Sequence, residues 1–156
     1  MAGDIIKGLI RLANDSDWNV RSPAVLALGR LIDLAPKSMS REISLILLKL
    51  TNDPEWAVRH SAAWSQGRLR SIIPKEMKND LINSLLKLSR DVDWSVRDAA
   101  VRSLGSLSTI IPKNRSREVI VTVVKLCSDS ERTVSDSAKR AIKKLKPAAP
   151  KKGTSQ

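Results

Sequence analysis

The stretch DVDWSVRDAAVRSLGSL, from Asp91 to Leu107, decides the fold because the chain contains four versions of it. Closely related copies are DSDWNVRSPAVLALGRL from Asp15 and DPEWAVRHSAAWSQGRL from Asp53, and a weaker copy, DSERTVSDSAKRAIKKL, starts at Asp129. Successive copies start 38 residues apart, and no insertion interrupts the period. A fixed period of this length is typical of solenoid proteins, in which each unit buries its apolar surface against its neighbours.

Prolines mark the boundaries between units. Pro36, Pro74, Pro112 and Pro150 keep the same period, and each is followed by lysine. Proline cannot continue a helix and disfavours helical geometry in the preceding residue. The predicted units are 1–38, 39–76, 77–114 and 115–150, the solenoid spans residues 1–146, and residues 147–156 are predicted to be a disordered basic tail.

Each unit is predicted to contain two helices. The first helices are expected over Gly3–Ala13, Ser40–Leu50, Met77–Ser89 and Arg117–Cys127, with apolar residues spaced four and then three apart. The second helices are the repeated stretch itself, and a carboxylate stands near the start of each, which suits the positive end of the helix dipole. Glycine recurs at one position of the second helix and predicts close helix contact there, because it otherwise destabilises a helix; the residues are Gly29, Gly67 and Gly105.

The turn aspartate, the Val-Arg pair, the alanine three residues later and the following leucines together resemble the HEAT-repeat family. The resemblance covers residues 1–150 and implies an all-α, right-handed superhelix of four helix pairs whose second helices line the concave surface. It also implies a structural charge ladder between neighbouring repeats, formed by Asp15, Arg21, Asp53, Arg59, Asp91 and Arg97.

Two groups of residues depart from simple repetition. Trp18, Trp56 and Trp94 hold one register and are expected to pack between repeats. In the fourth unit Ser135, Lys139 and Lys143 replace the arginine, valine and glycine of the third unit, as expected for a polar terminal repeat.

The charge favours a polyanionic partner. The chain has 28 basic and 16 acidic residues and a net charge of +12, and 11 of the basic side chains lie in residues 115–156. Such a field affects solubility and the choice of partner. Stacking the second helices is expected to align basic side chains on the concave face around Trp64, which could stack on a base. The predicted nucleic-acid-binding residues are Arg30, Trp64, Arg68, Arg102, Lys139, Arg140, Lys143 and Lys144.

Three functions remain open on this evidence. The favoured one is a non-catalytic module that binds the phosphate backbone of DNA or RNA with low sequence specificity. The second is a protein-interaction scaffold that takes an acidic peptide or helix in its groove, with Trp64 and Leu26 as anchors. The third is an alkylpurine DNA glycosylase of the HEAT-like type, for which Trp64 and Asp98 would be the functional residues.

Other chemistry finds little support in the composition. One histidine, His60, and one cysteine, Cys127, do not provide the ligands of a usual metal site, and no glycine-rich phosphate loop occurs, so neither an enzyme nor a cofactor is predicted. No apolar run approaches the length of a membrane span. We therefore expect a cytoplasmic protein, with association with the nucleoid or ribosome left open, and a homodimer through exposed apolar edges is also left open.

Overall fold

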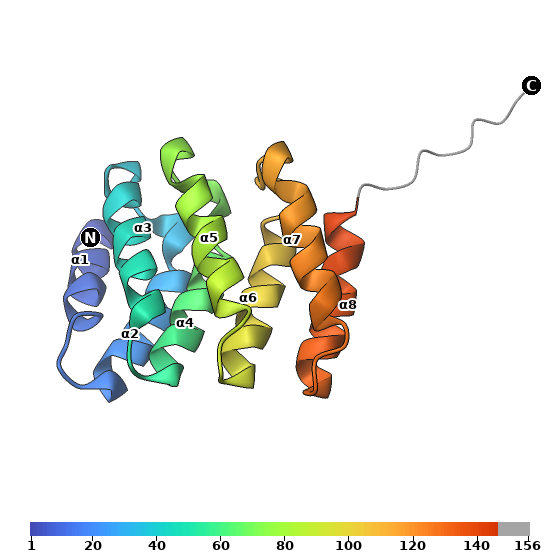
Figure 1. The fold of residues 1–156 in the computed structure, drawn as a ribbon. Helices are drawn as coiled ribbons and strands as arrows, with labels where there is room; N and C mark the ends of the chain where they lie inside the picture. The colour runs from blue at the N-terminus through green and yellow to red at the C-terminus, as the bar shows by residue number, and fades with distance from the viewer. Residues whose placement is uncertain (147–156) are drawn as a thin grey trace, which may run out of the picture.

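The computed structural model describes residues 1–146, and these form eight α-helices arranged as four antiparallel pairs (Figure 1). The pairs are α1 (Ala2–Leu12) with α2 (Trp18–Arg30), α3 (Ser40–Lys49) with α4 (Trp56–Gln66), α5 (Lys78–Leu88) with α6 (Trp94–Ser106), and α7 (Lys113–Leu126) with α8 (Arg132–Leu145). Odd-numbered helices form one layer of the stack and even-numbered helices the other (Figure 1). The predicted all-α solenoid of four helix pairs is confirmed.

The predicted helix bounds differ from the structure mainly in the fourth pair. After Pro36 and Pro74, short 3₁₀ turns (Lys37–Met39 and Lys75–Met77) precede α3 and α5. After Pro112 the corresponding segment is already α-helical, so α7 starts at Lys113 instead of the predicted Arg117. The predicted tail, residues 147–156, lies outside the described residues.

Aspartate side chains start two of the second helices. The Oδ1 atom of Asp17 accepts the N–H of Asn19 at 2.8 Å, and that of Asp93 accepts the N–H groups of Ser95 and Val96 at 2.9 and 3.3 Å. Each bond satisfies an amide that has no partner inside the helix, and the carboxylate also interacts favourably with the helix dipole. The periodic Asp-Trp sequence therefore fixes where these helices begin.

The second helices touch one another at the repeated glycines. A Cβ atom added to Gly29 would lie 2.8 Å from Ser65 Cβ, and one added to Gly67 would lie 2.8 Å from Ser103 Cβ. The Ser65 hydroxyl donates to the carbonyl oxygen of Val25 at 2.9 Å, so the serine is also held in place. The predicted close contact is confirmed, and the even-numbered helices pack against one another more extensively than the odd-numbered helices do.

An arginine–aspartate ladder joins successive repeats. Arg21 binds Asp53 through two hydrogen bonds, Nε to Oδ2 at 2.9 Å and Nη2 to Oδ1 at 3.0 Å. The remaining guanidinium nitrogen, Nη1, donates to the carbonyl oxygens of Asp15 and Ser16 in the turn of its own repeat. The same arrangement recurs for Arg59 with Asp91 and for Arg97 with Asp129.

Each ladder arginine therefore holds its own turn and the turn of the next repeat at once. Planar guanidinium groups suit this task because their donors form a rigid fork that matches a carboxylate. The carboxylate that receives each fork is mostly buried. Asp129, which the sequence prediction left out of the ladder, forms its last rung.

The prediction that Trp18, Trp56 and Trp94 pack between repeats is wrong. They remain 40%, 50% and 45% exposed. Each is the first residue of a second helix.

Replacing Gly29 with alanine is expected to destabilise the protein by about 1–3 kcal/mol, because the new methyl group would overlap Ser65. Gly8, inside α1, provides the matched control, since nothing lies within 4 Å of an added Cβ there. Gly8→Ala should instead raise the free energy of unfolding by up to about 1 kcal/mol through helix propensity. Urea unfolding followed by circular dichroism measures both, and equal effects of the two substitutions would contradict the close contact.

The ladder predicts acid sensitivity. Hydrogen bonds from Arg97 lower the pKa of Asp129, against the opposing effect of burial. Because the folded state favours the charged carboxylate, this stabilisation is present above the ordinary pKa of about 3.9 and is lost as pH falls through the lowered value. Asp129→Asn should cost about 1–3 kcal/mol at pH 7 and progressively less as pH falls below about 4, as measured by urea unfolding. Exposed Asp80→Asn should change stability at pH 7 by less than about 0.5 kcal/mol.

Candidate functional site

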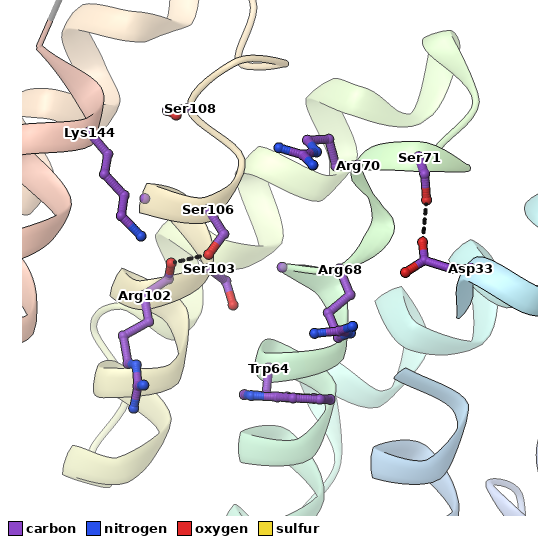
Figure 2. A pocket seen from close by; sticks show the side chains of 12 residues that line it. Asp33, Trp64, Arg68, Arg70, Ser71, Arg102, Ser103, Ser106, Ser108 and Lys144 are labelled. Atoms are coloured by element: carbon purple, nitrogen blue, oxygen red, sulfur yellow. Dashed lines mark hydrogen bonds between the residues drawn. The ribbon is translucent and has the colours of Figure 1, made fainter. Parts of the chain in front are cut away.

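The even-numbered helices carry a polar groove with a volume of about 540 Å³ at their C-terminal ends (Figure 2). Its walls come from successive repeats, and the lining side chains are mostly cationic or hydroxyl-bearing. They include Asp33, Trp64, Arg68, Arg70, Ser71, Arg102, Ser103, Ser106, Ser108 and Lys144. Four positive side chains therefore share one hollow with a single carboxylate.

The groove is assembled by the repeat itself. Trp64 lies on α4, and Arg68 follows two residues after its end at Gln66. Arg102 occupies on α6 the position that Trp64 occupies on α4, and Lys144 on α8 occupies the position equivalent to Arg68. The methylene stem of Lys144 passes near Gly105, where the close approach of α6 and α8 brings it to the groove. Stacking thus gathers residues that are 38 or 76 positions apart in equivalent registers.

The structure brings together only part of the predicted nucleic-acid-binding set. Trp64, Arg68, Arg102 and Lys144 line the groove, whereas Arg30 and Arg140 are exposed outside its lining. Lys139 and Lys143 occupy the positions of Val101 and Gly105 in the third repeat, which α8 covers there. These two lysines are exposed at the end of the stack, so they do not extend the groove.

Trp64 and Arg68 form a fixed pair on the groove wall. The guanidinium carbon of Arg68 lies 5.2 Å from the centre of the Trp64 ring, and Figure 2 shows the two groups stacked. Arg68 Nε also donates to the carbonyl oxygen of Gly29 in the preceding repeat at 2.9 Å. The cation–π contact and this hydrogen bond hold the guanidinium in place before any ligand arrives, which lowers the entropy lost on binding.

Acidic groups lie on the same helices nearer their N-terminal ends. Asp98 is only 7% exposed, its Oδ2 lies 3.6 Å from Nη1 of Arg102, and its Oδ1 has no hydrogen-bond partner among the described residues. Asp136 lies 3.6 Å from Arg132 and 3.9 Å from Lys139. The positive charge that sequence reasoning spread along the whole face is therefore concentrated at one end of it.

His60 adds no positive charge to this face near neutral pH. Its pKa is lowered, chiefly by burial, although the carboxylate of Asp98 acts in the opposite direction. Asp98 does not line the groove in which Trp64 stands, so these two residues, the candidates for a glycosylase site, do not form one site.

Sequence reasoning missed Arg70. The residue lies in a short 3₁₀ turn, Leu69–Ser71, that follows α4. Its equivalent Ile32 lies in the corresponding 3₁₀ turn, Ile32–Leu34, and is fully buried, whereas Arg70 is exposed. An arginine where another repeat has a buried isoleucine was the signal that could have identified it.

A second hollow, of about 690 Å³, lies at the turns between first and second helices. It is lined by Asp53, Arg59 and Asp91, whose charges already compensate one another in the ladder, together with Asn83, Lys87, Arg90 and Glu118. The basic groove is the stronger candidate because, among the described residues, Arg68, Arg70 and Lys144 form no ion pair and only Arg102 contacts a carboxylate, that of Asp98 at 3.6 Å.

Two negative findings concern residues 1–146. This part of the chain contains no group of three or more histidine, cysteine or acidic side chains placed to hold a metal ion. Among the same residues, every helix is too short or too polar to cross a lipid bilayer.

The comparison with protein families agrees with the architecture. The HEAT repeat pattern matches residues 5–35, 45–69 and 81–111, which is more than half of the chain. The chain therefore belongs to the HEAT repeat family, whose domains are typically non-catalytic binding scaffolds. No curated protein matches over the sequence.

Solved structures with the same fold include engineered repeat proteins. An engineered protein superposes with a TM-score of 0.70 at 22% identity, over 91% of this chain and 62% of its own. A designed armadillo repeat protein in complex with the peptide (KR)4 gives a TM-score of 0.67 at 20% identity, over 90% of this chain and 64% of its own. The chain thus spans less than two thirds of each of these proteins, and the likeness concerns the fold.

The unsatisfied oxygen of Asp98 predicts a stabilising substitution. Asp98→Asn keeps the shape of the side chain and removes a buried charge whose only cationic contact is long, so the free energy of unfolding should rise by about 1 kcal/mol. Urea unfolding at pH 7 measures this change. Asp80→Asn, at an exposed site, serves as the control, and a loss of stability in Asp98→Asn would show that the carboxylate is well compensated.

Proposed function

We propose that this chain is a protein-interaction scaffold whose basic groove binds an acidic, extended segment of a partner protein. The observation that supports this most directly is the clustering of Arg68, Arg70, Arg102 and Lys144 around one hollow. The only carboxylate in the lining, Asp33, accepts a hydrogen bond from the Ser71 hydroxyl at 2.9 Å. Carboxylates of a partner would supply the missing negative charge and form charge-assisted hydrogen bonds.

The groove also offers contacts that are not ionic. Trp64 is half-buried against the core and presents one face to the Arg68 guanidinium, and Leu26 lies at the equivalent position of the preceding repeat. Aromatic and arginine side chains at the centre of an interface usually contribute most of the binding energy. Serine hydroxyls at 71, 106 and 108 can bond to the backbone of a bound segment.

The designed armadillo protein that shares this fold is in complex with (KR)4, a strongly basic peptide. The groove of the present chain is itself basic, so by electrostatic complementarity its peptide would be acidic. Only peptide binding by a protein of the same fold is taken from the comparison.

Nucleic acid, which the net charge of +12 favours, is the weaker candidate. Binding along a nucleic-acid backbone depends on many phosphate contacts. Here the cations gather in one hollow, while Asp98, 3.6 Å from Arg102, and Asp136 add negative charge on the same helices. A short acidic segment matches such a local cluster better than a long polyanion does.

The test compares two fluorescent probes in anisotropy titrations, a glutamate octapeptide and a 20-base-pair duplex, in DNA and RNA forms. We expect the peptide to bind at low salt and to weaken as salt screens the ion pairs. Replacing Arg68 and Arg102 together with glutamine should weaken peptide binding at least about tenfold, since two charge-assisted contacts are lost. The matched control removes the same charge outside the groove, by Arg11→Gln with Arg117→Gln, and should change affinity by less than about twofold.

Other results would assign the function differently. Tighter binding of duplex than of peptide, with a loss on substituting Arg68 and Arg102, would establish a nucleic-acid module. Equal losses in the groove variant and the control variant would show that net charge, and not the groove, attracts the peptide.

A further inference from the structure

The N-terminal end of the stack leaves exposed the residues that the other repeats bury. Ile5 is 53% exposed, whereas its equivalents Ile43, Leu81 and Val119 are fully buried. Leu12 is 45% exposed, whereas Leu50 and Leu88 are 4% and 1% exposed and Leu126, in the fourth repeat, is partly buried. Leu9 and Val20 are likewise only partly buried in the first repeat, although both positions are fully buried in the other three.

The comparison among repeats identifies what normally covers these positions. Every repeat has its own second helix, so that helix alone does not bury them. Val119 is fully buried in the fourth repeat although no described repeat follows it, so a following repeat is not required. The remaining difference is a preceding helix pair, which repeats two to four have and the first repeat lacks in the structure.

The carboxylate of Asp15 likewise lacks a contact that its equivalents in the other repeats have. Its equivalents Asp53, Asp91 and Asp129 each receive the fork of an arginine from the preceding repeat. Asp15 accepts the N–H of Asp17 at 2.8 Å through Oδ1, as the ladder aspartates accept theirs. Its backbone carbonyl binds Arg21, but its carboxylate has no arginine partner among residues 1–146. The carboxylate is therefore held in the ladder geometry with its arginine site open.

The opposite end of the chain does not fit this surface. A ladder partner needs an arginine, a small apolar side chain and a glycine, as in Arg97, Val101 and Gly105. The fourth repeat has Ser135, Lys139 and Lys143 at these positions. Head-to-tail pairing of two copies would thus lack the arginine and place two lysines in an apolar contact.

We propose that the N-terminal end face, defined as Ile5, Leu9, Leu12, Asp15 and Val20, docks the terminal helix pair of a second HEAT-type protein that carries an arginine at the position of Arg97. The partner would continue the ladder by placing its arginine fork on Asp15, and its second helix would cover the exposed isoleucine and leucines. This interface repeats the one between neighbouring repeats, and it is independent of the basic groove.

A partner of this chemistry can be made from the chain itself. A probe with Ser135→Arg, Lys139→Val and Lys143→Gly restores the ladder pattern at the C-terminal end, and Ile5→Glu in the same probe blocks its own N-terminal end. Mixed with the wild-type protein at concentrations up to about 100 µM, the folded probe should form a 1:1 complex in sedimentation velocity. Growth beyond 1:1 is prevented because the wild-type C-terminal end lacks the arginine.

Substitutions in the wild-type component test the surface. Ile5→Glu should abolish the complex, and Asp15→Asn should weaken it at least about tenfold, because the arginine would lose its charged acceptor. Leu45→Glu is the matched control, since Leu45 is 51% exposed but lies outside the end face, and it should leave the complex unchanged. A folded probe that forms no complex, or a complex that survives Ile5→Glu, would overturn the proposal.

A fusion addresses the same point without altering the fourth repeat, should the probe fail to fold. A copy of residues 39–76, which contains Arg59, placed directly before Met1 keeps the 38-residue register. Amides of the added α4 copy should be protected from hydrogen exchange, and Asp15→Asn should reduce that protection at least about tenfold. An added unit that exchanges as fast as an unfolded chain would contradict the proposed surface.

Discussion

The arginine–aspartate fork is the interaction on which the rest of the structure depends. Each ladder arginine binds two carbonyl oxygens of its own turn and both carboxylate oxygens of the next repeat, as for Arg59 with Asp91. Apolar stripes alone would allow neighbouring helix pairs to slide, because hydrophobic contact is not directional. The fork fixes the relative position of the turns, and the groove side chains then follow at constant offsets along the second helices.

The fold could be predicted almost completely from the sequence, since four copies at a constant spacing specify both the unit and its neighbours. The contact at Gly29 was predictable too, because a glycine repeated inside a helix needs a reason. The wrong or missing predictions concern residues whose burial does not follow from their position in the repeat. Trp18 and its equivalents keep the register but are about half exposed, and Arg70 is exposed although its equivalent Ile32, also in a 3₁₀ turn, is buried.

The candidate site was less predictable than the fold. Projection of the second helices placed Trp64, Arg68, Arg102 and Lys144 on one face, and the structure gathers these four in the groove. The same projection did not reveal that Lys143 stands at an uncovered end of the stack, since a periodic pattern does not distinguish an inner from a terminal repeat. Hydrogen bonds such as the one from the Arg68 side chain to the carbonyl oxygen of Gly29 depend on atomic positions that the sequence period does not specify.

The glycine contacts have a consequence for recognition. Because Ser65 and Ser103 lie directly against the glycines of the preceding repeats, the second helices cannot approach one another more closely. The spacing between charged side chains on successive second helices is therefore determined by the backbone and not by the ligand. With the proposed acidic partner, this fixed spacing would favour segments whose negative charges recur at a matching interval over equally acidic segments with a different one.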